Sequence, residues 1–142
     1  MNLSNWLLKI AAVYFMGGSV FGLAMAITHD FSEAPVHAHL NLLGWVSLAV
    51  IGLIYRAQPG MAQTRLALAH FWLHNAGLPI GMSGLFLLLR GESHAMPVVS
   101  VGMVCVVLGI ACFVANVMLT LTRGRQLERE YLSERKIQSA GL

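Results

Sequence analysis

The chain has 142 residues, of which 57% are hydrophobic and 11% charged, and its mean hydropathy is +0.70. Soluble domains are about half apolar and a quarter charged, so the composition excludes an ordinary soluble domain and predicts an integral membrane protein. The net charge of +3 is small, and no feature of the chain indicates nucleic-acid binding.

Four apolar runs are long enough to cross a bilayer, which takes about 20 residues each. They cover residues 6–28, 35–56, 66–89 and 96–122. Because the connections are short, we expect a single all-α domain, residues 1–142, built as an up-and-down bundle of four transmembrane helices. Residues 123–142 would then form a basic tail outside the membrane.

The placement of positive charge predicts the orientation. Arg56 and Arg65 flank the second connection, whereas the first and third connections carry acidic residues as well. Further basic residues follow the fourth run: Arg123, Arg125, Arg129, Arg135 and Lys136. The positive-inside rule then predicts a multi-pass protein of a bacterial inner membrane with both termini in the cytoplasm. The tail would rest on anionic lipid headgroups.

The first run is rich in small residues and reads as a retained helix, not a cleaved signal peptide. Gly18 and Gly22 form a small-xxx-small pattern, which typically lets two membrane helices pack closely.

The second run begins with Pro35 and carries His37 and His39. Imidazoles in a membrane are costly and mark candidate functional sites. Residues two apart on a helix point about 200° from each other, so one small ion cannot bind both. Asn41 shares the face of His37 and can hold an imidazole or a cofactor edge, or bond to a neighbouring helix. Gly44 offers a flat spot for the approach of a large group.

The third run carries His70 and His74 one turn apart on one face, a spacing that can bind a metal ion. We expect this pair at another depth from the first, so one site with all four histidines is not expected. His70 also fits an interfacial histidine, and His74 a purely structural hydrogen bond. Gly77, Pro79 and Gly81 predict a kink or local unwinding.

The fourth run reads as a scaffold whose lone strongly polar residue is Asn116. Cys105 and Cys112 lie about two turns apart, too far for a disulfide. His29 and His94 close the outward ends of the first and third helices and are expected to be solvated.

The histidines of the second run lie in a longer motif. His37-Ala38-His39 with the residues to Trp45 resembles the H-x-H motif in the tenth helix of the heme–copper oxidase catalytic subunit, closest to its C-type branch. Phe71-Trp72-Leu73 is similar to a stretch in that subunit's next helix. Small membrane proteins with this motif form an oxidase-like family. The similarity covers the second and third helices.

The resemblance implies one third of the large subunit, and hence a homotrimer with the second helix at each subunit contact. His37 of one copy and His39 of its neighbour would be the axial ligands of a heme b iron. Apart from the resemblance, the residue types and spacing make Asn41, Gly44 and His74 further candidate cofactor contacts.

The chain departs from the oxidases at their copper centre, which needs three histidines and a nearby tyrosine. Only His70 and His74 remain, and Tyr14 and Tyr55 have no evident histidine partner, so oxygen or nitric oxide reduction is not expected. A heme with two histidine ligands favours electron transfer. The resemblance therefore implies electron transfer, or sensing of heme or a gas, with an electron donor or a larger respiratory complex as partner.

Two alternatives stay open. The six histidines and several methionines also suit a membrane protein that binds copper or zinc without heme. The chain can also be a structural assembly factor for a respiratory complex, with its histidines only hydrogen-bonded.

Overall fold

A computed structural model describes residues 2–140, and beyond residue 126 it describes only some side chains. The Lys136 side chain and residues 141–142 of the predicted tail lie outside this described part. The elements in chain order are α1 (Leu3–Thr28), α2 (Ala34–His39), the π-helix η1 (Leu40–Ser47), α3 (Leu48–Ala57), α4 (Pro59–Ala62), α5 (Arg65–Leu89), the 3-10 helix η2 (Ser93–Ala95) and α6 (Met96–Ala140).

The described residues hold four helical stretches that are long and apolar enough to cross a membrane: Leu3–Thr28, Ala34–Ala57, Arg65–Leu89 and Ser93–Gln126. The second of them runs through α2, η1 and α3. This confirms the prediction of four helices of membrane-spanning length and composition, with ends that differ from the predicted ones by a few residues.

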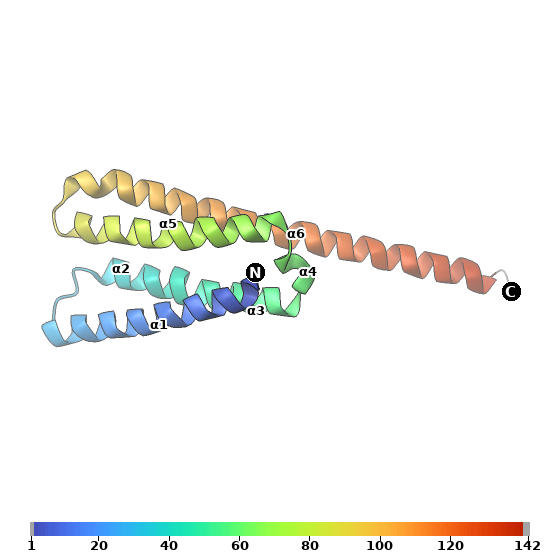
Figure 1. Ribbon diagram of the computed structural model, residues 1–142, viewed down its shortest axis with the longest axis horizontal. Helices are drawn as coiled ribbons and strands as arrows, with labels where there is room; N and C mark the ends of the chain where they lie inside the picture. The colour runs from blue at the N-terminus through green and yellow to red at the C-terminus, as the bar shows by residue number, and fades with distance from the viewer. Residues whose placement is uncertain (1, 141–142) are drawn as a thin grey trace.

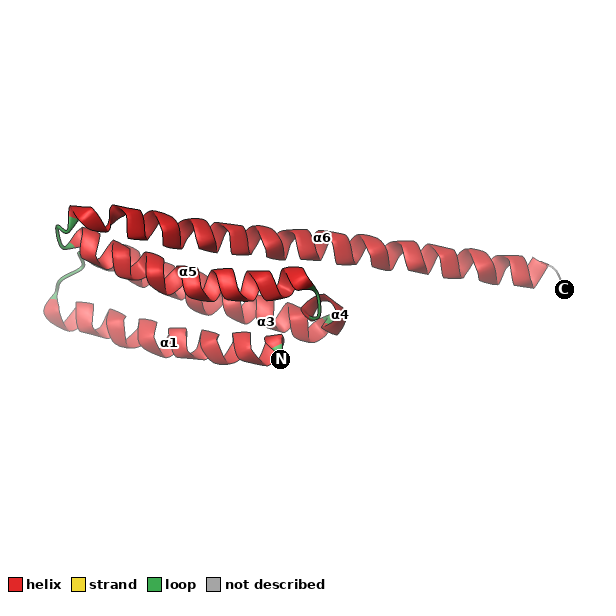
Figure 2. Cartoon of the chain, turned by 45° about the horizontal axis from the view of Figure 1, so that its top comes forward, coloured by secondary structure: helices red, strands yellow, loops and turns green. Residues whose placement is uncertain are grey.

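The helices form two antiparallel hairpins, as Figure 1 shows: α1 pairs with the α2–η1–α3 stretch, and α5 pairs with α6. The loops after α1 and α5 lie at one end, which we call the loop end. The N-terminus and α4 lie at the other, here called the α4 end. Figure 2 shows α6 continuing far beyond the other helices.

Glycines let α5 and α6 approach closely. A Cβ placed on Gly102 of α6 would overlap the backbone of Gly81, and a Cβ on Gly77 would come within 2.7 Å of the Gly102 carbonyl oxygen. Gly84 and Gly109 make similar contacts. The hydrophobic effect gives no driving force between helices in lipid. Small residues at such crossings let the helices associate through close van der Waals packing instead.

Apolar side chains cover the outer faces of the hairpins. On α1, for example, Val13, Met16 and Val20 are all exposed. In water such surface would be unfavourable, but a membrane-spanning helix presents it to lipid or to another subunit.

Two features of the backbone differ from the expectations. Of the kink or local unwinding predicted at Gly77, Pro79 and Gly81, the unwinding is wrong, because α5 runs as one unbroken α-helix with Pro79 inside it, and the kink stays a prediction. The irregular backbone lies instead in the second helix, at η1. The fourth helix also continues to Ala140 instead of ending near Thr122, because the tail is rich in the helix-favouring residues Arg, Gln, Glu and Leu.

An ion pair joins the two loops at the loop end. Arg90 Nε donates a hydrogen bond of 2.8 Å to Glu33 Oε1, and the Glu33 side chain is only 6% exposed against 59% for Arg90. The other carboxylate oxygen of Glu33 is buried without a partner in the described part of the chain. This carboxylate therefore depends on one cation.

Replacing Arg90 by alanine should lower the melting temperature of the detergent-solubilised protein. The buried Glu33 carboxylate would lose its cation, at a cost of about 1–3 kcal/mol in the free energy of unfolding. Adding Glu33→Gln removes the charge and should restore most of the loss. If Arg90→Ala melts like the wild type, the ion pair does not stabilise the fold.

Candidate functional site

The second helix turns His37 and Asn41 toward α1. Asn41 Nδ2 donates a hydrogen bond of 2.9 Å to the His37 backbone carbonyl, and it lies 3.4–3.5 Å from both ring nitrogens of His37. A Cβ on Gly22 would lie 2.8 Å from His37 Cε1, and one on Gly18 would lie 2.7 Å from the Asn41 amide. The small-xxx-small pattern of α1 therefore makes room for these two polar side chains, and the shared face of His37 and Asn41 is confirmed.

His39 has different surroundings. Its Nδ1–H donates a hydrogen bond of 2.7 Å to the Pro35 carbonyl, and the side chain is partly exposed. Because Nδ1 carries the proton in this bond, Nε2 keeps its lone pair, and Nε2 forms no hydrogen bond with the described residues. Histidine ligands of metals are commonly oriented by such a bond from the other ring nitrogen.

Gly44 is covered by an aromatic ring from α1. A Cβ on Gly44 would lie 2.6 Å from Tyr14 Cδ1 and Cγ, so the large group next to this glycine is Tyr14 of the same chain. The neighbouring Trp45 packs on Phe15, with ring centroids 4.1 Å apart.

His70 and His74 lie inside the protein, both with no exposed surface. Their ring centroids are 5.3 Å apart. His74 Nε2–H donates a hydrogen bond of 3.1 Å to the carbonyl of Leu43 in η1, whereas His74 Nδ1 and both nitrogens of His70 are buried without a partner in the described residues. His70 lies against Tyr55 of α3 and Phe113 of α6, so protein encloses it on these sides.

The expectation that Tyr55 has no histidine partner is also wrong. The Tyr55 ring meets His70 edge-on at 6.3 Å between centroids, and Phe113 of α6 lies 5.7 Å from His70. Tyr55 lies in the last turn of α3 and His70 in the second turn of α5, and the turn through α4 brings these rings together.

Asn116 joins three elements at the α4 end. Its Nδ2 donates to the Met61 carbonyl at 3.0 Å, and its Oδ1 accepts a bond of 2.8 Å from the Thr64 hydroxyl. The hydroxyl of Tyr55 lies 3.5 Å from Nδ2. This agrees with the predicted scaffold role of α6 and gives it a specific polar anchor.

The remaining candidates lie apart from both histidine pairs. His29 and His94 are exposed at the loop end, and both cysteines are free, as expected. Among the described residues, no three His, Cys, Asp or Glu side chains are placed to hold one ion together. His74 is joined to the second helix by its hydrogen bond to the carbonyl of Leu43, which follows His39 by four residues.

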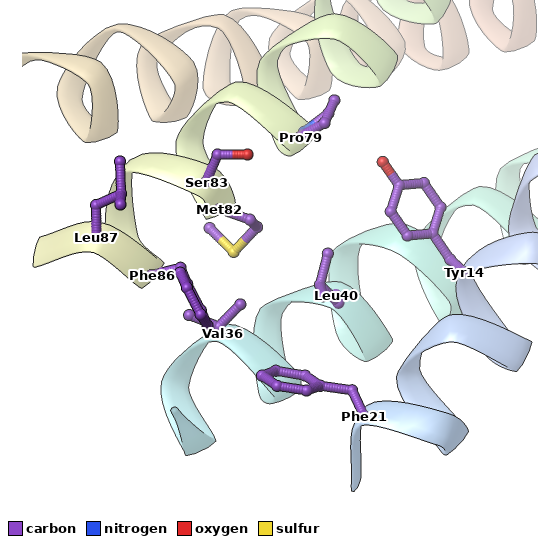
Figure 3. A pocket seen from close by; sticks show the side chains of 9 residues that line it. All are labelled: Tyr14, Phe21, Val36, Leu40, Pro79, Met82, Ser83, Phe86 and Leu87. Carbon is purple, nitrogen blue, oxygen red and sulfur yellow. The ribbon is translucent and has the colours of Figure 1, made fainter. Parts of the chain in front are cut away.

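A cavity of about 540 Å³ lies between the hairpins on the loop-end side. Figure 3 shows the side chains that line it: Tyr14, Phe21, Val36, Leu40, Pro79, Met82, Ser83, Phe86 and Leu87. Its walls are apolar apart from the hydroxyls of Tyr14 and Ser83, so it suits apolar matter such as an acyl chain and offers no nitrogen ligand.

Comparisons of the chain with protein-family models, with curated proteins and with solved structures gave no match. The resemblance to the oxidase subunit therefore stays a prediction from the two motifs.

Proposed function

We propose that this protein is a heme b-binding membrane protein of the oxidase-subunit-like kind, which carries electrons or senses heme or a diatomic gas. The observation that carries the proposal is His39. Its Nδ1 is tied to the Pro35 carbonyl, its Nε2 lone pair is free, and its side chain is partly exposed at the side of a membrane helix.

His37 would be the second axial ligand, supplied by another copy of the chain. His37 lies against Gly22 on the α1 side, whereas His39 projects from the other side of the helix, so one iron cannot bind both from one chain. Among the described residues, the ring nitrogens of His37 have only the long contacts of 3.4–3.5 Å to the Asn41 amide, and that amide already donates a hydrogen bond to the His37 carbonyl. A homotrimer in which each heme joins two copies satisfies both histidines.

Different residues position the two histidines in this proposal. Gly22 and Asn41 hold the His37 ring against α1, and the Pro35 carbonyl fixes the tautomer and direction of His39. When bound, the heme supplies one-electron redox chemistry, and two histidine ligands favour electron transfer over ligand binding. The location in a bacterial inner membrane with cytoplasmic termini belongs to the same proposal.

A visible spectrum of the detergent-purified protein, oxidised and then reduced with dithionite, tests the proposal. We expect a Soret band with sharp reduced α and β bands, the pattern of a low-spin heme with two histidine ligands. Carbon monoxide should leave that spectrum unchanged for pure electron transfer and shift it for a gas sensor. A featureless spectrum after expression with ample heme would refute heme binding.

Gly22 provides a test that leaves both histidines in place. In Gly22→Ala the new methyl group would push on the His37 ring, so we expect the heme content to fall severalfold. Gly17→Ala is the matched control, because nothing lies within 4 Å of a Cβ on Gly17. Equal heme content in the two variants would show that the position of His37 against α1 does not matter for heme binding.

A further inference from the structure

His70 and His74 form a buried pair that the proposed heme site does not use. Three of their four ring nitrogens are buried without a partner in the described residues. A buried polar atom without a hydrogen bond costs about 1–3 kcal/mol, so such a cluster calls for a ligand.

The hydrogen bond to Leu43 determines the state of His74. The carbonyl accepts, so Nε2 carries the proton and Nδ1 carries the lone pair. A metal-binding histidine commonly donates its other N–H to a backbone carbonyl in this way. His74 is thus prepared as a ligand through Nδ1, by a carbonyl from the π-helical segment of another helix.

The spacing of the two rings suits one shared ion. Side chains on a helix lean toward its N-terminus, so the His74 ring leans toward His70 one turn earlier. With metal–nitrogen bonds of about 2.0 Å, two imidazoles on one ion place their ring centroids about 5 Å apart at a bent, near-tetrahedral angle and about 6 Å apart when the nitrogen–metal–nitrogen angle is linear. The observed separation of 5.3 Å lies in this range.

The surroundings select the charge of the ion. The described residues add no third His, Cys, Asp or Glu ligand, and Tyr55 and Phe113 enclose His70 with aromatic rings. The cost of burying an ion rises with the square of its charge, so a divalent ion costs about four times as much as a monovalent one. Imidazole is a good ligand for both zinc and copper, so the lower cost of burying a monovalent ion is what favours Cu(I) over Zn²⁺ here.

We propose that His70 and His74 bind one monovalent copper ion inside the protein, separately from the heme site. The ligands are His74 Nδ1 and one ring nitrogen of His70, and the Leu43 carbonyl orients His74. This site does not depend on heme, and it persists in a chain whose heme ligands are removed.

The test is anaerobic titration of the full-length protein in detergent with Cu(I), supplied as its acetonitrile complex, against a chromophoric Cu(I) chelator. We expect one Cu(I) per chain in the wild type and in His39→Ala. His70→Ala and His74→Ala should weaken binding by about a hundredfold or more, since each removes a ligand. His29→Ala and His94→Ala are the matched controls and should bind like the wild type.

Two outcomes would overturn the proposal: a wild type that takes up no Cu(I), or His70→Ala and His74→Ala proteins that bind it as the wild type does. X-ray absorption at the copper edge of the wild type gives a second answer that needs no variant. We expect nitrogen neighbours at about 2.0 Å and no sulfur. Sulfur neighbours, or Zn²⁺ retained as tightly as Cu(I), would contradict the assignment.

Discussion

Replacing His39 by alanine is expected to abolish heme retention in the purified protein. In the proposed site the 2.7 Å bond to the Pro35 carbonyl orients this imidazole as an axial ligand. Without it the proposed heme keeps one axial histidine at most. The Soret absorbance per chain should fall to background, and His37→Ala should have the same effect because each heme needs both residues.

The loop histidines give the control for this experiment. His29→Ala and His94→Ala remove exposed imidazoles at the same end of the molecule and should leave the heme spectrum unchanged. Co-expression of the His37→Ala and His39→Ala variants in one membrane gives a sharper test of the subunit contact. A trimer assembled from both would retain heme only at contacts that pair an intact His37 with an intact His39. Undiminished heme in either pure variant would contradict the ligand assignment.

Replacing Gly102 by alanine is expected to have the largest effect on stability. A Cβ there would overlap the Gly81 backbone, and backbone cannot move aside as a flexible side chain can. The α5–α6 hairpin would have to open along its length, at a cost of about 3 kcal/mol or more. Unfolding of the purified protein in mixed SDS–detergent micelles, followed by circular dichroism, measures this loss.

Gly124 of the same helix is the matched control. Nothing lies within 4 Å of a Cβ at Gly124, so Gly124→Ala should be neutral or stabilise the helix by about 1 kcal/mol through its higher helix propensity. If both alanine variants unfold alike, the close approach of α5 and α6 does not determine the stability of the hairpin.

The sequence predicts the four helices well because a bilayer imposes a simple requirement on length and hydropathy. It also predicts that His37 and Asn41 share a face, since that follows from helix periodicity within one turn. The contacts of Tyr55 with His70, and of Asn116 with Met61, could not be predicted in this way. They depend on how the end of α3, the start of α5 and the middle of α6 meet around α4, and these residues are far apart in the chain.

The π-helical segment could not be predicted either, because no residue type specifies it. Leu40–Ser47 contains no proline, and its one glycine, Gly44, is covered by Tyr14. The irregularity follows from packing on two neighbours at once, α1 at Gly44 and α5 at Leu43.

The π-helical segment also determines how α2 is rotated about the helix axis relative to α3. Val36 and Tyr55 are both buried although they are 19 positions apart, which in a regular α-helix would separate them by about 100°. One extra residue in the wider turns removes about that angle and puts both on one side. Deleting a single residue between 40 and 47 would therefore rotate His37 and His39 by about 100° relative to α3. The direction in which the two histidines point relative to α3 is thus determined by the number of residues in the segment that follows directly after His39.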